Sequence, residues 1–350
     1  MSRQIVNQLP QFLHPERVLE HPKSTLQIQV YRPMKFLLFC AFFSLILPAS
    51  YGLTSSRQLL AAGRVDEALH SLQQDVQRSP QDAESYNLLC RAYFAMDEWD
   101  HAISNCERAR SLDPQNSMYS LWLGRALGEK ADRAGFISAA GLVKKVRTSF
   151  ESAVQLDPKN WEARTDLAEF YLEAPSIVGG GKDKARQQAD ALMWLNPAMG
   201  HWILGRIAEK EKNPAEAERE YRAEITTSHG CSRGWLDLAI FFHHQDRVDE
   251  MEQAVLQVES SRVDRPESLM DGASLLFHAG RNYPLAIRLL RRYLSDGPVE
   301  EGPAFKAQVL LGEILEKQGD RQAAASQYRS ALALYRGYPR AEEGLRRVDR

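Results

Sequence analysis

The sequence has few cysteines, almost no net charge and only one long apolar run. Its 350 residues include four cysteines, with no CxxC pair and no Cys/His cluster at zinc spacing. This scarcity excludes a fold built on disulfides. The formal net charge is −2, from 44 basic and 46 acidic side chains. A nucleic-acid binder that relies on bulk positive charge is therefore excluded as well.

The usual catalytic motifs are also missing. No HExxH, GxSxG, Walker or dinucleotide fingerprint occurs, and the GGGK at residues 179–182 has no strand before it and no Ser or Thr after it. His243, His244 and His278 fall at adjacent positions of successive predicted helices. Neighbouring side chains diverge by about 100° around a helix, so we interpret these histidines as solvated rather than metal-binding. We predict a non-catalytic protein with no cofactor and no metal.

Residues 36–49 form the single long apolar run, FLLFCAFFSLILPA. Arg32 and Lys35 precede it, and small residues follow it up to Gly52. A basic flank, an apolar centre and small residues in this order are typical of a secretory signal. We predict that residues 34–52 are a signal peptide cut after Gly52, with an uncut membrane anchor as the alternative. The run is short for a spanning helix, which needs about 20 residues.

Residues 1–33 are polar, mixed in charge and interrupted by prolines, which predicts a disordered segment. They are either a long cytoplasmic extension or a misassigned start, because Met34 would place the basic residues at the beginning of the signal. In both cases the protein is expected to be exported, periplasmic or anchored in the membrane. Any membrane association would run through residues 36–49.

From about residue 53 the chain repeats itself with a period of 34 residues. The clearest unit, residues 83–116, reads as two amphipathic helices joined by a short turn. Ala102 and Ala109 are small enough to let two helices approach closely. Pro114 ends the second helix, since proline disfavours helix in the residue before it.

This pattern resembles the tetratricopeptide repeat family, and it recurs in LWLGRAL at 121–127, in AVQLDP at 153–158 and in the unit from Ala307. The resemblance implies an all-α fold, a right-handed solenoid of stacked antiparallel helix pairs over residues 53–350. The units start near residues 53, 83, 117, 161, 198, 232, 267 and 305, and Ala341–Val348 forms a closing helix.

Two of these units are longer than the family length. The third has about ten extra residues between its helices, which should lengthen its first helix or form a short additional one. The fourth has about five extra residues in a long turn at 173–185.

In this family the first helix of each unit lines a concave groove. Arg57, Arg91 and Arg125 occupy one equivalent position in three successive units, which predicts a row of guanidiniums along that groove. The candidate groove residues are Arg57, Asn87, Leu88, Arg91, Phe94, Leu121, Trp122, Arg125, Trp202 and Arg206. The fourth unit presents the acidic residues Glu162, Asp166, Glu169 and Glu173.

Two interpretations of the arginines stay open. Arginine offers a planar fork of donors that suits carboxylates, so a partner peptide could place a carboxylate near Arg91 and Arg125. Alternatively, the arginines pair with acidic neighbours on adjacent helices and hold the solenoid together.

Cys90 and Cys106 should lie opposite each other in the second helix pair. If the protein is exported, they are a candidate disulfide. Otherwise they are two buried thiols that act as small hydrophobes.

The predicted function is a non-catalytic scaffold for protein–protein interaction, outside the cytoplasm or at the membrane. Its partner would be another protein or a peptide, and not nucleic acid. Alternatives are a solenoid that binds a small anionic ligand or glycan, and an accessory subunit of an enzyme complex in the envelope.

Overall fold

The computed structural model describes residues 56–133 and 136–349, which lie in one compact unit of the chain, Leu47–Arg350. In this part of the chain every regular element is a helix, and extended backbone pairs only at an isolated bridge between Cys231 and Arg262. The predicted all-α solenoid of paired helices is confirmed. None of the helices among these residues is long and apolar enough to cross a membrane. The predicted segments 1–33 and 34–52 lie outside the described residues.

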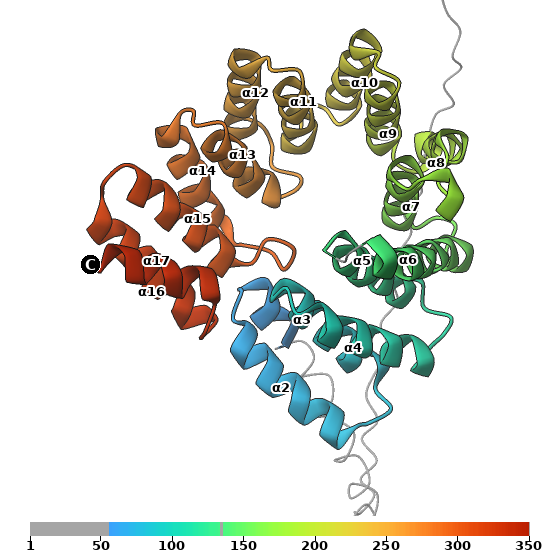
Figure 1. Ribbon diagram of the computed structural model, residues 1–350, viewed down its shortest axis with the longest axis horizontal. Coiled ribbons are helices and arrows are strands. Elements are labelled where there is room, and N and C mark those ends of the chain that lie inside the picture. Colours follow the sequence, from blue (N-terminus) through green and yellow to red (C-terminus); the bar gives the residue numbers. More distant parts are fainter. Residues whose placement is uncertain (1–55, 134–135, 350) are drawn as a thin grey trace, which may run out of the picture. The chain divides into compact units, whose positions relative to one another are not determined.

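The helices follow one another as antiparallel pairs (Figure 1). The first helices are α3 (Ala83–Ala95), α5 (Ser117–Asp132), α7 (Trp161–Glu173), α9 (Pro197–Lys210), α11 (Ser232–His244), α13 (Glu267–His278) and α15 (Ala304–Lys317). The second helices are α4 (Trp99–Leu112), α6 (Phe136–Leu156), α8 (Lys182–Leu195), α10 (Pro214–Thr227), α12 (Val248–Ser260), α14 (Tyr283–Asp296) and α16 (Arg321–Leu334). The remaining elements are a helical segment at 56–61, α2 (Val65–Arg78), the 3-10 turn η1 (Ser176–Val178) and the last helix α17 (Pro339–Val348).

A recurring turn explains where the first helices begin. Asp82, Asn116 and Asn160 each stand two residues after a proline, and their side chains accept a hydrogen bond from a backbone N–H of the helix that follows. The proline ends the preceding helix, and the short polar side chain caps the next one. The same local signal therefore both separates two pairs and starts the second.

Small residues set the distance between paired helices. Ala102 and Ala109 of α4 are completely buried. In α5, Gly124 lies directly against the ring of Phe150 on α6, so closely that a Cβ at this position would overlap the ring. The close approach lets the large residues of both helices share one core.

The extra residues of the third pair extend its second helix. The first helix α5 has 16 residues and is longer than the other first helices, as one of the two predictions had it, but most of the insertion lies in α6, which runs without a break for 21 residues, Phe136–Leu156. The alternative prediction of a short additional helix was wrong. No proline interrupts Phe136–Leu156, so the helix can continue through the insertion. In the predicted long turn at 173–185, residues 174–181 connect α7 to α8 and contain η1, and Lys184 Nζ on α8 donates to the Gly179 carbonyl at 2.9 Å.

The two ends of the described array meet (Figure 1). Lys306 Nζ on α15 lies 2.9 Å from Oδ1 of Asp97, a residue in the turn after α3. The backbone N–H of Arg336, after α16, donates to Asp66 Oδ2 on α2 at 2.8 Å. These contacts join residues more than 200 positions apart in the sequence. The solenoid thus closes on itself within the described residues.

The contact at Gly124 generates a test with a matched control on the same helix. We expect Gly124→Ala to lower the free energy of unfolding by about 1–3 kcal/mol, because Phe150 must move to accommodate the new methyl group. Gly128→Ala has open space around it and should be neutral or stabilising by up to about 1 kcal/mol, since alanine favours helix. Urea denaturation of both variants measures the difference. Equal effects at the two positions would contradict the close packing of α5 on α6.

Candidate functional site

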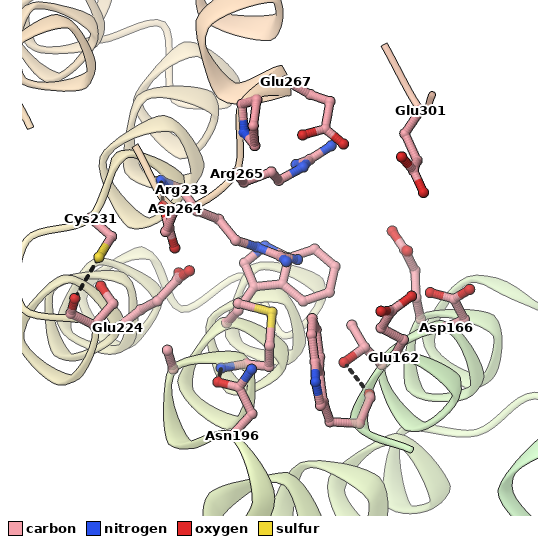
Figure 2. A pocket seen from close by; sticks show the side chains of 18 of the residues that line it. Glu162, Asp166, Asn196, Glu224, Cys231, Arg233, Asp264, Arg265, Glu267 and Glu301 are labelled. Carbon is pink, nitrogen blue, oxygen red and sulfur yellow. Dashed lines mark hydrogen bonds between the residues drawn. The ribbon is translucent and has the colours of Figure 1, made fainter. Parts of the chain in front are cut away.

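The first helices surround a cavity of about 930 Å³. Its walls come from α3, α5, α7 and α9, from the end of α10, from the starts of α11 and α13, and from the turns after α10, α12 and α14. Figure 2 shows side chains that line it. This volume is at the upper end of what ligand-binding pockets offer. The charged residues that line it are Arg125, Glu162, Asp166, Glu169, Glu224, Arg233, Arg262, Asp264, Arg265, Glu267 and Glu301. Seven carboxylates thus face four guanidiniums.

Arg91 belongs to the contact that closes the array. Its guanidinium donates two hydrogen bonds, of 2.5 and 2.6 Å, to the two carboxylate oxygens of Glu300. Both side chains are largely buried, with 17% of Arg91 and 11% of Glu300 exposed. Burial raises the pKa of Glu300, and the charge of Arg91 opposes this rise. The pair holds the α14–α15 loop against α3.

The other arginines of the predicted row are also paired with carboxylates of neighbouring helices. Arg57 forms an ion pair with Glu84 of the next pair. The remaining pairings are Arg125 with Asp166 (2.6 Å) and Glu162 (3.1 Å), and Arg206 with Glu169 (3.0 Å) and Glu173 (2.8 Å). The acidic face of α7 is therefore held between arginines from α5 and α9. This arrangement corresponds to the second of the two interpretations of the arginines.

Two of the predicted aromatic residues stack with these guanidiniums. Arg91 and Arg125 both lie over the ring of Trp122, at 4.8 and 5.0 Å from its centroid. Arg206 lies over Trp202 at 5.5 Å. Phe94 packs edge-on against Trp122, and all three aromatic side chains line the cavity.

Four of the ten predicted groove residues line the cavity, namely Phe94, Trp122, Arg125 and Trp202. Arg57, Arg91 and Arg206 lie outside its lining, and so do three further predicted residues that are buried. Leu88 and Leu121 are fully buried, and Asn87 is 3% exposed. Leu88 and Leu121 belong to the hydrophobic core, as do the residues that follow them, Leu89 and Trp122. The neighbouring helix pairs cover the face of the helix on which each leucine lies. The predicted contact of Leu88 and Leu121 with a partner was wrong, because no part of either leucine is accessible in the closed array.

The sequence pattern missed the α14–α15 loop, which contributes Val299 and Glu301 to the cavity. Tyr293 on α14 anchors the loop, because its hydroxyl donates to the Gly302 carbonyl and accepts from the Val299 N–H at 3.0 Å. Glu300, between the two lining residues, is the partner of Arg91. The closing ion pair therefore positions one wall of the cavity.

Glu224 and Asp237 form a buried pair of carboxyls beside the cavity. Glu224 is 1% exposed, and neither of its oxygens has a hydrogen-bond partner among the described residues. Burial, reinforced by the charge of Asp237, raises the pKa of Glu224 well above its ordinary value. Burial also raises the pKa of Asp237, against the attraction of Arg233 at 3.7 Å. Two adjacent buried carboxyls are most stable when they share a proton or meet a cation.

The three described cysteines fall into two classes. Cys90 on α3 and Cys106 on α4 are joined by a disulfide, with their Cα atoms 5.2 Å apart. Cys231 is a buried free thiol that donates to the Ser228 carbonyl and accepts from Arg262. Burial raises the pKa of Cys231, so this thiol stays protonated at neutral pH.

No group of three or more His, Cys, Asp or Glu side chains in the described part of the chain is arranged to hold a metal ion. His244 instead pairs with Glu209 at 3.1 Å, and His278 bonds to the Ser274 carbonyl of its own helix. The arrangement that remains is a cavity lined by indoles and charged groups.

Two separate parts of the chain match sequence models of the tetratricopeptide repeat, residues 59–126 and residues 271–339. These two parts of the chain are similar to tetratricopeptide repeats. They lie at the two ends of the described array, which are also the ends that meet. The middle of the array continues the same helix pairing.

Solved structures of other proteins resemble the chain in fold. Yeast Tom70 is 14% identical, with a TM-score of 0.55, and the match covers 90% of this chain and 66% of Tom70. A thermophilic tetratricopeptide protein from Thermus thermophilus is 18% identical over 60% of this chain and all of its own, with a TM-score of 0.46. None of the curated proteins compared with this chain matches it. At these identities the likeness shows the fold alone.

The disulfide generates the test of this subsection. In protein isolated from its own cells with free thiols blocked, we expect Cys90 and Cys106 to be recovered as one linked pair. Cys231 should react only after unfolding, because it is buried. Mass spectrometry of the digest, with and without reductant, measures both. Recovery of Cys90 and Cys106 as alkylated thiols would contradict the bond.

Proposed function

We propose that this chain is a non-catalytic scaffold that holds a segment of a partner protein in the cavity between its first helices. Tetratricopeptide arrays in general serve protein–protein interaction. The observation that carries the proposal is the cavity of about 930 Å³, walled by successive helix pairs and by the closing loop. A segment of several residues could place side chains on more than one repeat at once.

The lining of the cavity supports a protein partner. Trp122, Trp161 and Trp202 all contribute to its walls, together with Phe94 and Met199. Large aromatic side chains surrounded by charged groups are the residues that dominate binding energy at protein interfaces. The cavity combines these anchors with carboxylates and guanidiniums that can select a partner by charge.

We further propose that the scaffold acts outside the cytoplasm or at the membrane. The signal-like segment at residues 34–52 favours this location, with residues 36–49 as the membrane contact. The Cys90–Cys106 disulfide favours it independently, since structural disulfides persist in oxidising compartments and are rare in the cytosol. Reduced Cys90 and Cys106 in protein taken from its cells would count against this location.

Filling the cavity tests whether the partner lies in it. Thr227 lines the cavity, whereas its neighbour Thr226 is equally exposed but does not. We expect Thr227→Trp to reduce partner recovery in crosslinked affinity purification at least tenfold, because the indole occupies space that the partner segment needs. The matched control, Thr226→Trp, should leave recovery unchanged. Equal recovery with both variants would place the partner elsewhere and refute the proposal.

A further inference from the structure

The four arginines that line the cavity already have partners within the chain. Arg125 pairs with Asp166 and Glu162. Arg233 lies 3.7 Å from Asp237, and Arg265 lies 3.3 Å from Asp271. Arg262 donates to the Cys231 sulfur. A partner carboxylate could reach Arg125, Arg233 or Arg265 only by displacing an ion pair. Breaking a buried pair leaves one charge without compensation, which is strongly unfavourable. These arginines are therefore poor receptors for an anionic segment.

The carboxylates of the cavity, by contrast, are in excess. Glu301 and Glu267 line it without an ion pair or hydrogen bond among the described residues. Glu162 shares Arg125 with Asp166, and its side chain remains 41% exposed. Glu301, Glu162 and Asp166 lie on the same side of the cavity (Figure 2). That side presents unbalanced negative charge to whatever enters.

Glu224 is a further acidic residue at the cavity, and its carboxyl is directed into the cavity from α10 (Figure 2). It is almost completely buried, and it interacts with Asp237 and Arg233. Two adjacent buried carboxyls are satisfied when they share a proton, so Glu224 by itself does not require a cation.

An aromatic surface for a cation is available beside the acidic side. Trp161 lines the cavity at the start of α7, next to Glu162 in the sequence and five residues before Asp166. Arginines already stack on Trp122 and Trp202, but no guanidinium or ammonium in the described part of the chain lies over Trp161. An indole face flanked by carboxylates is the preferred surroundings of an organic cation.

We propose that the partner segment is basic and inserts a lysine or arginine side chain between Trp161 and the carboxylates Glu162 and Glu301. This inference rests on the proposed function and adds the chemistry of the partner. The cation would stack on the indole and bond to carboxylate oxygens that the chain's own donors leave available. It would also leave the closing pair Arg91–Glu300 intact, so that binding and closure do not compete.

Two labelled peptides test the sign of the charge. A fluorescein-labelled octapeptide of alternating lysine and alanine is titrated with the full chain, in parallel with the counterpart that has glutamate in place of lysine. Fluorescence anisotropy should show the lysine peptide bound at least tenfold more tightly, and added salt should weaken its binding. Equal affinities, tighter binding of the glutamate peptide, or binding of neither would overturn the proposal.

Single substitutions locate the binding on the acidic side. We expect Glu301→Gln and Glu162→Gln each to weaken the lysine peptide about five- to tenfold, because each removes one charge-assisted hydrogen bond. Glu343→Gln on α17 removes the same charge from an exposed position outside the cavity lining, and should change affinity less than twofold. Equal loss with all three variants would indicate unspecific attraction by net charge and contradict the proposal.

The partner recovered from cells separates this inference from the proposed function. If Thr227→Trp abolishes its recovery while Glu301→Gln leaves recovery unchanged or increases it, the cavity binds a partner but not a basic one. If Thr227→Trp has no effect, the proposed function itself fails. Loss of recovery with both variants, and not with Glu343→Gln, supports both.

Discussion

The ion pair between Arg91 and Glu300 determines what kind of surface this array presents. An open solenoid offers a groove with two free ends. Here the loop before α15 is bonded back to α3, 209 positions earlier in the sequence. The flanking residues Val299 and Glu301 thereby become one wall of a cavity whose other walls are the first helices. Glycine at position 63 belongs to the same closure, since a Cβ there would lie 2.8 Å from the backbone nitrogen of Ala304.

The closure also decides the electrostatics of the cavity. Arginines that could have attracted an anionic partner are consumed by contacts between neighbouring pairs or between the two ends. The Arg91–Glu300 pair is buried and bidentate, a geometry in which guanidinium–carboxylate bonds are strong, and Arg125 and Arg206 each bind two carboxylates. Of the carboxylates that line the cavity, Glu267 and Glu301 are left without an ion pair among the described residues. The excess of negative charge in the cavity is thus a consequence of how the array is held together.

Repetition made the fold predictable from the sequence. Periodic apolar positions, a proline two residues before Asp82, Asn116 and Asn160, and small residues such as Ala102 are local signals, and they recur. The sequence likewise placed Arg91 and Arg125, which are 34 residues apart, and Trp122 beside them on the concave side. Leu88 and Leu121 could not be placed correctly, because a position on a helix face does not tell how far the neighbouring pair covers it.

The contribution of the α14–α15 loop could not be predicted for a different reason. Glu300 and Glu301 lie outside the repeated positions, and their partner Arg91 is distant in the chain, so no periodicity links them. Whether a solenoid closes depends on the sum of small rotations between its pairs. A change in that rotation at any one pair would separate the ends. Trp161 and Glu224 were missed because their role depends on the cavity that closure creates.

Zero-length crosslinking of the native chain tests closure most directly. A carbodiimide joins a lysine to a carboxylate only when the two are in contact, and Lys306 Nζ lies 2.9 Å from Asp97 Oδ1. Lys210 and Glu173, 2.6 Å apart on adjacent first helices, provide the internal standard. In the monomeric fraction, closure predicts that both crosslinked peptides are recovered in comparable yield. Recovery of the Lys210–Glu173 link without the Lys306–Asp97 link would contradict a closed array, and with it the cavity.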